Sequence, residues 1–116
     1  MRGATGHHAG LAAEEIVRRH YEDRGLTLAH HRWRCKAGEI DLVLREGARV
    51  IFVEVKLAAT HDRAAEKLGP RQIGRLFAAA EVFVGDEPAG AMTDIRFDVA
   101  LVDARGRVQI RENAFS

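Results

Sequence analysis

Two short segments carry the residues best suited to chemistry. EIDLVL, residues 39–44, and VIFVEVK, residues 50–56, each mix β-favouring apolar residues with charged ones. Charges are rare in such strands, because an unpaired buried charge is strongly destabilising. Strand alternation places Glu39 and Asp41 on one face of the first strand, and Glu54 and Lys56 on one face of the second. The opposite face of the first strand then carries Ile40, Leu42 and Leu44.

The turn between these strands determines which charged residues meet. A two-residue turn centred on the Gly-Ala dipeptide of REGAR places Asp41 opposite Glu54, and Glu39 opposite Lys56. Opposed residues in an antiparallel pair have Cβ atoms about 4.5–5.5 Å apart. A slip of one residue would send the acids to opposite faces, so the prediction depends on this turn.

Two carboxylates held this close repel each other unless one keeps its proton or a cation lies between them. Mg²⁺ is suited to such a site, because it binds one or two carboxylates and accepts phosphate oxygens in its remaining positions. The chain has no Cys/His cluster of the kind that binds zinc. Asp41 and Glu54 are therefore predicted to bind Mg²⁺, with Mn²⁺ as a substitute, and Lys56 to orient water or offset charge. The alternative is a Glu39–Lys56 salt bridge, with the other two acids pointing into solvent.

The surrounding sequence predicts an α/β fold with a mixed central sheet flanked by helices, in the order α-β-β-β-α-β-β. A flexible leader is predicted at residues 1–8 and a single domain at residues 9–116. The predicted elements are a helix at 9–24, strands at 26–34, 39–44 and 50–57, a polar loop to residue 69, a helix at 70–84, and strands at 95–103 and 108–110. The first helix is expected to form an apolar stripe of Ala13, Ile16, Val17 and Tyr21, and the second one of Ile73, Leu76, Phe77 and Ala80.

Composition limits the class of protein. The chain of 116 residues is 47% hydrophobic and 30% charged, which suits one globular domain. It contains no signal-peptide pattern, no apolar run long enough to cross a bilayer, and only Cys35 as a thiol, so we expect a cytoplasmic protein without a membrane partner. The net charge of +1 does not discriminate, but basic clusters permit contact with nucleic-acid phosphates. The candidate contacts are Arg32, Arg34, Lys36, Arg71 and Arg75.

Several other residues have two interpretations. Trp33 could stack on an unpaired base, but a half-buried strand position is favoured. For His30 and His31, exposure of at least one to solvent is favoured over catalysis. Asp98 is expected to pair with Arg96 or a neighbour rather than bind metal.

The strings GEIDLV and FVEVK, with the helix and strand segments from about residue 10 to 102, resemble the bacterial YraN family of predicted nucleases. The resemblance implies a restriction-endonuclease-like fold with a PD-(D/E)-x-K core, a mixed four-stranded sheet and one or two Mg²⁺ ions at the strand ends. In this resemblance Asp41 matches the metal-binding aspartate, Glu54 the second acidic ligand and Lys56 the catalytic lysine.

The same resemblance extends to three further positions. Glu14 matches a helix glutamate similar to the extra acid of archaeal Holliday-junction resolvases, and its neighbour Glu15 could be confused with it. Glu39 belongs to the GEID string. Gln72 stands where many relatives have a lysine. Two departures are Ile40, which precedes the aspartate in place of proline, and Leu57, which follows EVK in place of a basic or hydroxyl residue.

The function expected from these features is Mg²⁺-dependent hydrolysis of phosphodiester bonds in DNA, including branched DNA that resembles a Holliday junction. One alternative is a non-catalytic module that retains the nuclease fold and binds nucleic acid or protein. Another is a subunit that is active only as a homodimer or with a partner.

Overall fold

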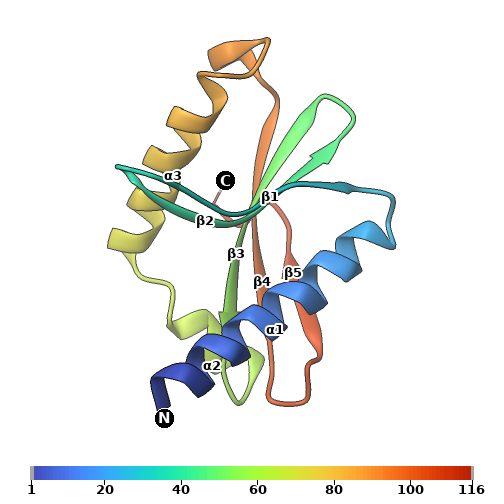
Figure 1. The fold of residues 1–116 in the computed structure, drawn as a ribbon, viewed down its shortest axis with the longest axis vertical. Coiled ribbons are helices and arrows are strands. Elements are labelled where there is room, and N and C mark those ends of the chain that lie inside the picture. The colour runs from blue at the N-terminus through green and yellow to red at the C-terminus, as the bar shows by residue number, and fades with distance from the viewer. Residues whose placement is uncertain (1, 116) are drawn as a thin grey trace.

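A five-stranded mixed sheet forms the centre of the protein (Figure 1). The computed structural model describes the backbone of residues 2–115 and the side chains of residues 8–115. The strands lie side by side in chain order, and only β3 and β4 run parallel. The strands are β1 (Thr27–Cys35), β2 (Gly38–Glu46), β3 (Arg49–Leu57), β4 (Ile95–Val102) and β5 (Val108–Arg111). The α/β architecture and the predicted order of strands are confirmed.

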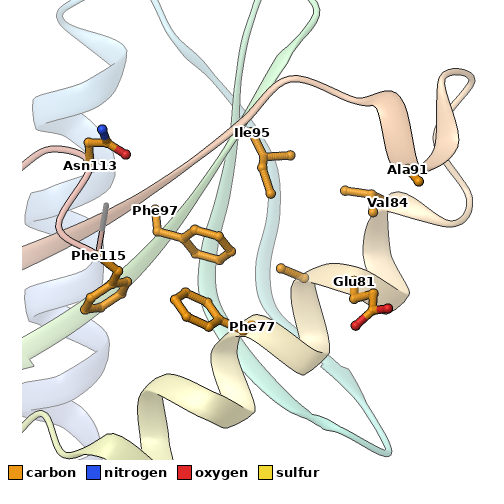
Figure 2. A pocket seen from close by; sticks show the side chains of 9 residues that line it. Phe77, Glu81, Val84, Ala91, Ile95, Phe97, Asn113 and Phe115 are labelled. Atoms are coloured by element: carbon orange, nitrogen blue, oxygen red, sulfur yellow. The ribbon is translucent and has the colours of Figure 1, made fainter.

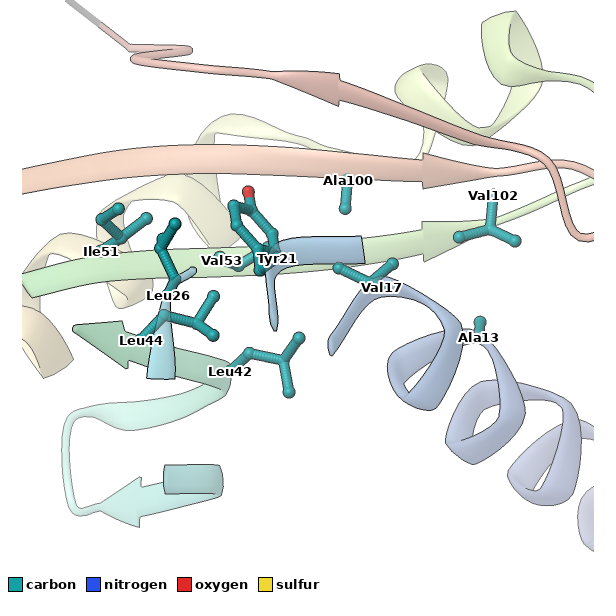
Figure 3. Packing of buried hydrophobic residues seen from close by; sticks show 10 residues of the cluster. All are labelled: Ala13, Val17, Tyr21, Leu26, Leu42, Leu44, Ile51, Val53, Ala100 and Val102. Atoms are coloured by element: carbon teal, nitrogen blue, oxygen red, sulfur yellow. The ribbon is translucent and has the colours of Figure 1, made fainter. Parts of the chain in front are cut away.

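Two long helices cover opposite faces of this sheet. Helix α1 (Arg2–Glu22) contributes Ala13, Val17 and Tyr21 to a buried cluster with β2, β3 and β4 (Figure 3). Helix α3 (Pro70–Val84) packs against the opposite face, where Val50 and Phe52 point away from the first cluster. Within the described residues, neither these helices nor any other has the length and apolar character of a membrane span.

Helix α1 is longer at its N-terminus than the sequence predicted. It begins at Arg2 rather than Ala9 and ends at Glu22, so the predicted start is wrong. Of the expected stripe, Ile16 is 37% exposed and does not belong to the core. The division into a leader and a domain stays a prediction, and the side chain of His7 lies outside the described residues.

The segment predicted as a polar loop contains a short helix, α2 (His61–Glu66). The Thr60 hydroxyl accepts a hydrogen bond from the backbone N–H of Arg63 at 3.2 Å, and Asp62 lies in the first turn. Ala64 is fully buried against β4 residues. A threonine before a short polar segment is a recognised N-cap signal, so this helix was detectable in the sequence. A 3₁₀ turn (Gly90–Met92) precedes β4.

The bounds of α3 agree with the prediction, but its buried face is rotated. Leu76 and Ala80 are buried as expected, whereas Phe77 is 41% exposed. Ala79 and Phe83 are buried in its place, because Phe83 packs edge-on against the half-buried Trp33 at 5.2 Å between ring centroids. The interpretation of Trp33 as a half-buried strand residue is confirmed.

The β2–β3 hairpin has the predicted register only as far as the middle of the strands. Leu42 pairs with Val53 and Glu46 with Arg49, symmetrically about the Gly-Ala turn. The described pairing stops at Leu42, so the expected direct pairs of Asp41 with Glu54 and of Glu39 with Lys56 are wrong.

The pairing of β2 with β1 is also interrupted at this point and resumes at Trp33 and Ile40. The described β1–β2 register skips the pair of Arg32 and Asp41, and Arg32 has a left-handed backbone with φ of 53°. Strand alternation had predicted that Ile40 shares a face with Leu42. In the structure Ile40 instead packs with Val43 and Phe52, on the opposite face. A kink of β2 at Asp41 therefore reverses the face of the preceding residue, Ile40.

The buried carboxylate of Asp98 ties three parts of the chain together. It is fully buried and accepts hydrogen bonds from the Tyr21 hydroxyl at 2.8 Å, the Arg96 Nε at 2.9 Å and the backbone N–H of Asn113 at 3.0 Å. Burial and this neighbouring carboxylate raise the pKa of Tyr21. The predicted pairing of Asp98 with Arg96 is confirmed.

We expect Asp98→Ala to lower the free energy of unfolding by about 3–5 kcal/mol, because the buried Tyr21 hydroxyl loses its acceptor and the half-buried Arg96 loses its main carboxylate partner. Asp94→Ala serves as the control, since Asp94 pairs with Arg49 on the surface and its loss should cost about 1 kcal/mol or less. Urea denaturation measures both. Equal losses in the two variants would contradict the structural role of Asp98.

Candidate active site

The kink in β2 aims the carboxylate of Asp41 at the neighbouring strand. Its Oδ2 accepts a hydrogen bond from the backbone N–H of Val55 at 2.8 Å. This N–H lies beyond the last described β2–β3 pair, so the side chain takes the place of a backbone acceptor. The contact fixes Asp41 beside Glu54, the residue before Val55. The two acids therefore meet, although not as the directly opposed pair that the sequence predicted.

Glu54 is held by residues from β3 and α3. It is only 5% exposed, and its Oε1 accepts a hydrogen bond from Gln72 Nε2 at 3.1 Å. The Lys56 ammonium lies 3.6 Å from the same oxygen. The structure thus brings the two predicted acids, the lysine and Gln72 together at one place.

Burial and proximity disfavour two negative charges at this place. Burial raises the pKa of Asp41, and the nearby charge of Glu14 adds to the effect. Burial, followed by the charge of Asp41, raises the pKa of Glu54 to about 9, and Lys56 offsets only part of this rise. Because each acid influences the other, the pair titrates as a unit. Near neutral pH and without a cation, the pair is expected to hold one proton.

The acids open into a polar pocket of about 420 Å³ between the β1–β2 hairpin and the start of α3. A Cβ atom on Gly38 would lie 3.3 Å from the carbonyl oxygen of Arg75, so a glycine lets the hairpin end rest directly on α3. Arg71 and Arg75 are exposed residues of the pocket wall. The lining residues are Gly38, Glu39, Asp41, Glu54, Gly69, Arg71, Gln72 and Arg75.

Glu14 is engaged elsewhere. Arg32 donates from Nε to one of its carboxylate oxygens at 2.9 Å and from Nη2 to the other at 3.0 Å. His31 Nε2 lies 2.6 Å from the first oxygen. Among residues 8–115 no three Asp, Glu, His or Cys side chains are grouped as a metal site. The structure therefore does not bring Glu14 into one ligand set with Asp41 and Glu54.

The remaining predicted residues divide into two groups. Glu39 lines the pocket but pairs with Arg34, so the alternative Glu39–Lys56 salt bridge is wrong. Lys36 is exposed in the turn between β1 and β2. His30 and His31 are both exposed, which agrees with the preferred interpretation.

Two contributors were missed in the sequence. Arg32 had been assigned only to nucleic-acid contact and His31 only to the surface, yet both hold Glu14. No local signal marks this arrangement, because it depends on a left-handed arginine, a conformation that sequence patterns rarely predict for this residue type.

The raised pKa of Glu54 should make the cation-free protein less stable as the pH rises. A carboxyl group whose folded pKa exceeds its unfolded value binds more protons in the folded state, so stability falls between the ordinary carboxyl range and about 9. We expect Glu54→Gln to flatten this decline in urea unfolding between about pH 5 and pH 8 in EDTA. Glu46→Gln, an exposed control, should keep the wild-type slope. An unchanged slope in Glu54→Gln would contradict the assignment.

Comparisons with known proteins identify the family. A family model described as Uncharacterised protein family UPF0102 matches residues 13–102. A UPF0102 protein of Ruegeria pomeroyi is 56% identical over 114 residues, covering 98% of this chain and 93% of its own length. A UPF0102 protein of Cereibacter sphaeroides is 53% identical over 116 residues, covering 100% and 99%. One from Dinoroseobacter shibae is 40% identical over 112 residues, covering 97% and 84%. The chain belongs to the UPF0102 family.

Proposed function

We propose that this protein is a Mg²⁺-dependent endonuclease that hydrolyses phosphodiester bonds of DNA, with Mn²⁺ able to replace Mg²⁺. The observation that carries the proposal is the half-buried Asp41 beside the buried Glu54, with the Lys56 ammonium 3.6 Å from Glu54. Two neighbouring acids in a polar pocket, with a lysine beside one of them, are a costly arrangement for stability alone. Such costs are typical of functional sites.

The donor set suits a hard divalent cation. Carboxylate oxygens are the protein ligands that Mg²⁺ prefers, and a cation would replace the proton that the raised pKa of the pair retains. A bound Mg²⁺ would supply charge stabilisation on the phosphate oxygens. Asp41 and Glu54 are the residues that would hold it. Glu14 would join them only by giving up its contacts with Arg32 and His31.

The chain's own groups would then divide the remaining tasks. Gln72 fixes the Glu54 carboxylate through its hydrogen bond, so this ligand is oriented before any cation arrives. Lys56 would position the nucleophilic water or offset the negative charge that develops on the phosphate. Arg71 and Arg75, in the wall of the same pocket, would bind neighbouring phosphates without reading bases.

The resemblance to the YraN family also supports this proposal. GEIDLV and FVEVK are the strings by which the chain resembles the YraN family, and they place Asp41, Glu54 and Lys56 at the positions of the PD-(D/E)-x-K residues. The match to UPF0102 covers this whole region, because it spans residues 13–102.

One observation favours a second candidate, a binding module without catalysis. Both carboxylate oxygens of Glu14 are occupied by Arg32, which leaves two acids for a cation. A module of this kind would bind nucleic acid through the pocket arginines and would not cleave it.

Cleavage of labelled DNA distinguishes the two candidates. The substrates are a four-way junction, a flap, linear duplex and single-stranded DNA, with matched RNA, in Mg²⁺ or Mn²⁺. We expect the wild type to cut at least one DNA. Lys56→Ala should cut the same DNA about 10²–10³-fold more slowly, because the variant lacks the ammonium group that stabilises negative charge on the phosphate in the transition state. Lys67→Ala, which removes an exposed lysine outside the pocket, should cut at the wild-type rate.

The same panel contains the contradicting results. Binding without cleavage by the folded wild type would support the module. Equal rates for Lys56→Ala and Lys67→Ala would show that the activity does not come from this site.

A further inference from the structure

Most of the exposed large apolar side chains lie in one stretch of the chain. Within the described residues, every exposed large hydrophobic except Ile16 lies on α3 or between its end and the start of β4. Phe77 is 41% exposed and Val82 49%. Exposed apolar side chains that form a contiguous patch often mark an interaction site.

Beside this part of α3 lies a second pocket, of about 500 Å³, with mainly apolar walls (Figure 2). Three aromatic rings from three parts of the chain meet in it, and Phe77 lies 4.8 Å from Phe97 between centroids. Figure 2 shows Glu81 on the helix at the pocket and Asn113 on the opposite side. The apolar walls come chiefly from Phe77, Val84, Ile95, Phe97 and Phe115.

The charges of α3 run against the helix dipole. Arg71 and Arg75 lie in its first half, whereas Glu81 and Asp86 lie in its last turn and just beyond it. The first turn has no acid and the last turn no base, which is the less stable order for an isolated helix. Within the described residues none of these four side chains makes a hydrogen bond or ion pair.

We infer that the exposed face of α3 is the interface of a homodimer in which the two α3 helices cross antiparallel. In that arrangement the basic half of each helix lies against the acidic end of the other, twice per dimer. Each unpaired charge then also lies beside the favourable end of the partner's dipole. The occupant that fits this face is therefore a second copy of the chain.

Small residues at the middle of α3 allow the crossing. Gly74 and Ala78 lie on the outward side between the basic and acidic ends, and a Cβ on Gly74 would meet no atom within 4 Å. Helices packed through small residues approach to about 8 Å between axes. A two-fold axis near Ala78 keeps Phe77 and its pocket on the same flank in both copies. The apolar flank of one copy therefore meets that of the other.

The interface would also border the candidate active site. Arg71 and Arg75 line the acid pocket, so in the dimer the partner's acidic helix end would compete with phosphates for these two arginines. The inference does not depend on nuclease activity, because it rests on the apolar and charge pattern of α3 alone.

Sedimentation equilibrium of the full chain at several concentrations tests the dimer. Two double variants are used, and each reverses the charges in one half of α3. One is Arg71→Glu with Arg75→Glu, and the other is Glu81→Arg with Asp86→Arg. Each alone should weaken the dimer at least about tenfold, because like charges then face each other. An equimolar mixture should restore association, since the reversed halves are complementary. Circular dichroism confirms that each variant is folded.

Cross-linking tests the position of the axis. In a Cys35→Ser background, Ala78→Cys should form an intermolecular disulfide under mild oxidation, whereas Ala12→Cys on the exposed part of α1 should not. A wild type that stays monomeric at about 100 μM would overturn the inference. So would charge variants that dimerise as the wild type does, a mixture that does not associate, or a dimer that Ala78→Cys fails to link.

Discussion

The close approach of the half-buried Asp41 to the buried Glu54 is the constraint on which the rest of the site depends. Burial disfavours the charged form of both carboxyl groups, and the charge of Asp41 further disfavours ionisation of Glu54. Their neighbours only partly compensate: Val55 donates to Asp41, while Gln72 and Lys56 contact Glu54. An acid pair of this kind has to bind a proton or a cation, and this choice links the fold to the proposed activity.

The fold accommodates this pair by breaking a regular hairpin. Strand β2 follows β3 as far as Leu42 and then turns away, so Asp41 leaves both described ladders. The left-handed backbone of Arg32 lies at the corresponding point of β1, and its guanidinium is fixed by Glu14 of α1. Helix α1 thus supports the kink from one face, while Gln72 of α3 reaches Glu54 from the other. If β2 continued to pair regularly with β3 through Asp41, a backbone carbonyl would accept from the Val55 N–H. The kink leaves this N–H for the Asp41 side chain.

The sequence was sufficient for features that depend on local patterns. Strand alternation and the Gly-Ala turn predicted the hairpin register, and Pro70 predicted the start of α3. The same alternation failed at Ile40, because the kink at Asp41 places Ile40 on the face of Val43 and Phe52. It also could not place Glu14, since the contacts of Glu14 with His31 and Arg32 join residues 17 and 18 positions apart. The short helix α2 was missed although Thr60 gave a usable cap signal.

The most direct measurement of the central claim is a calorimetric titration with Mn²⁺ near pH 7.5 in two buffers of different ionisation enthalpy. If Asp41 and Glu54 share a proton that the cation displaces, the apparent binding enthalpy should differ between the two buffers. The difference should correspond to about one proton taken up by the buffer per bound ion. Asp41→Asn should abolish binding and proton release together. Binding with no proton release, or equal binding by Asp41→Asn, would contradict a cation site at this acid pair.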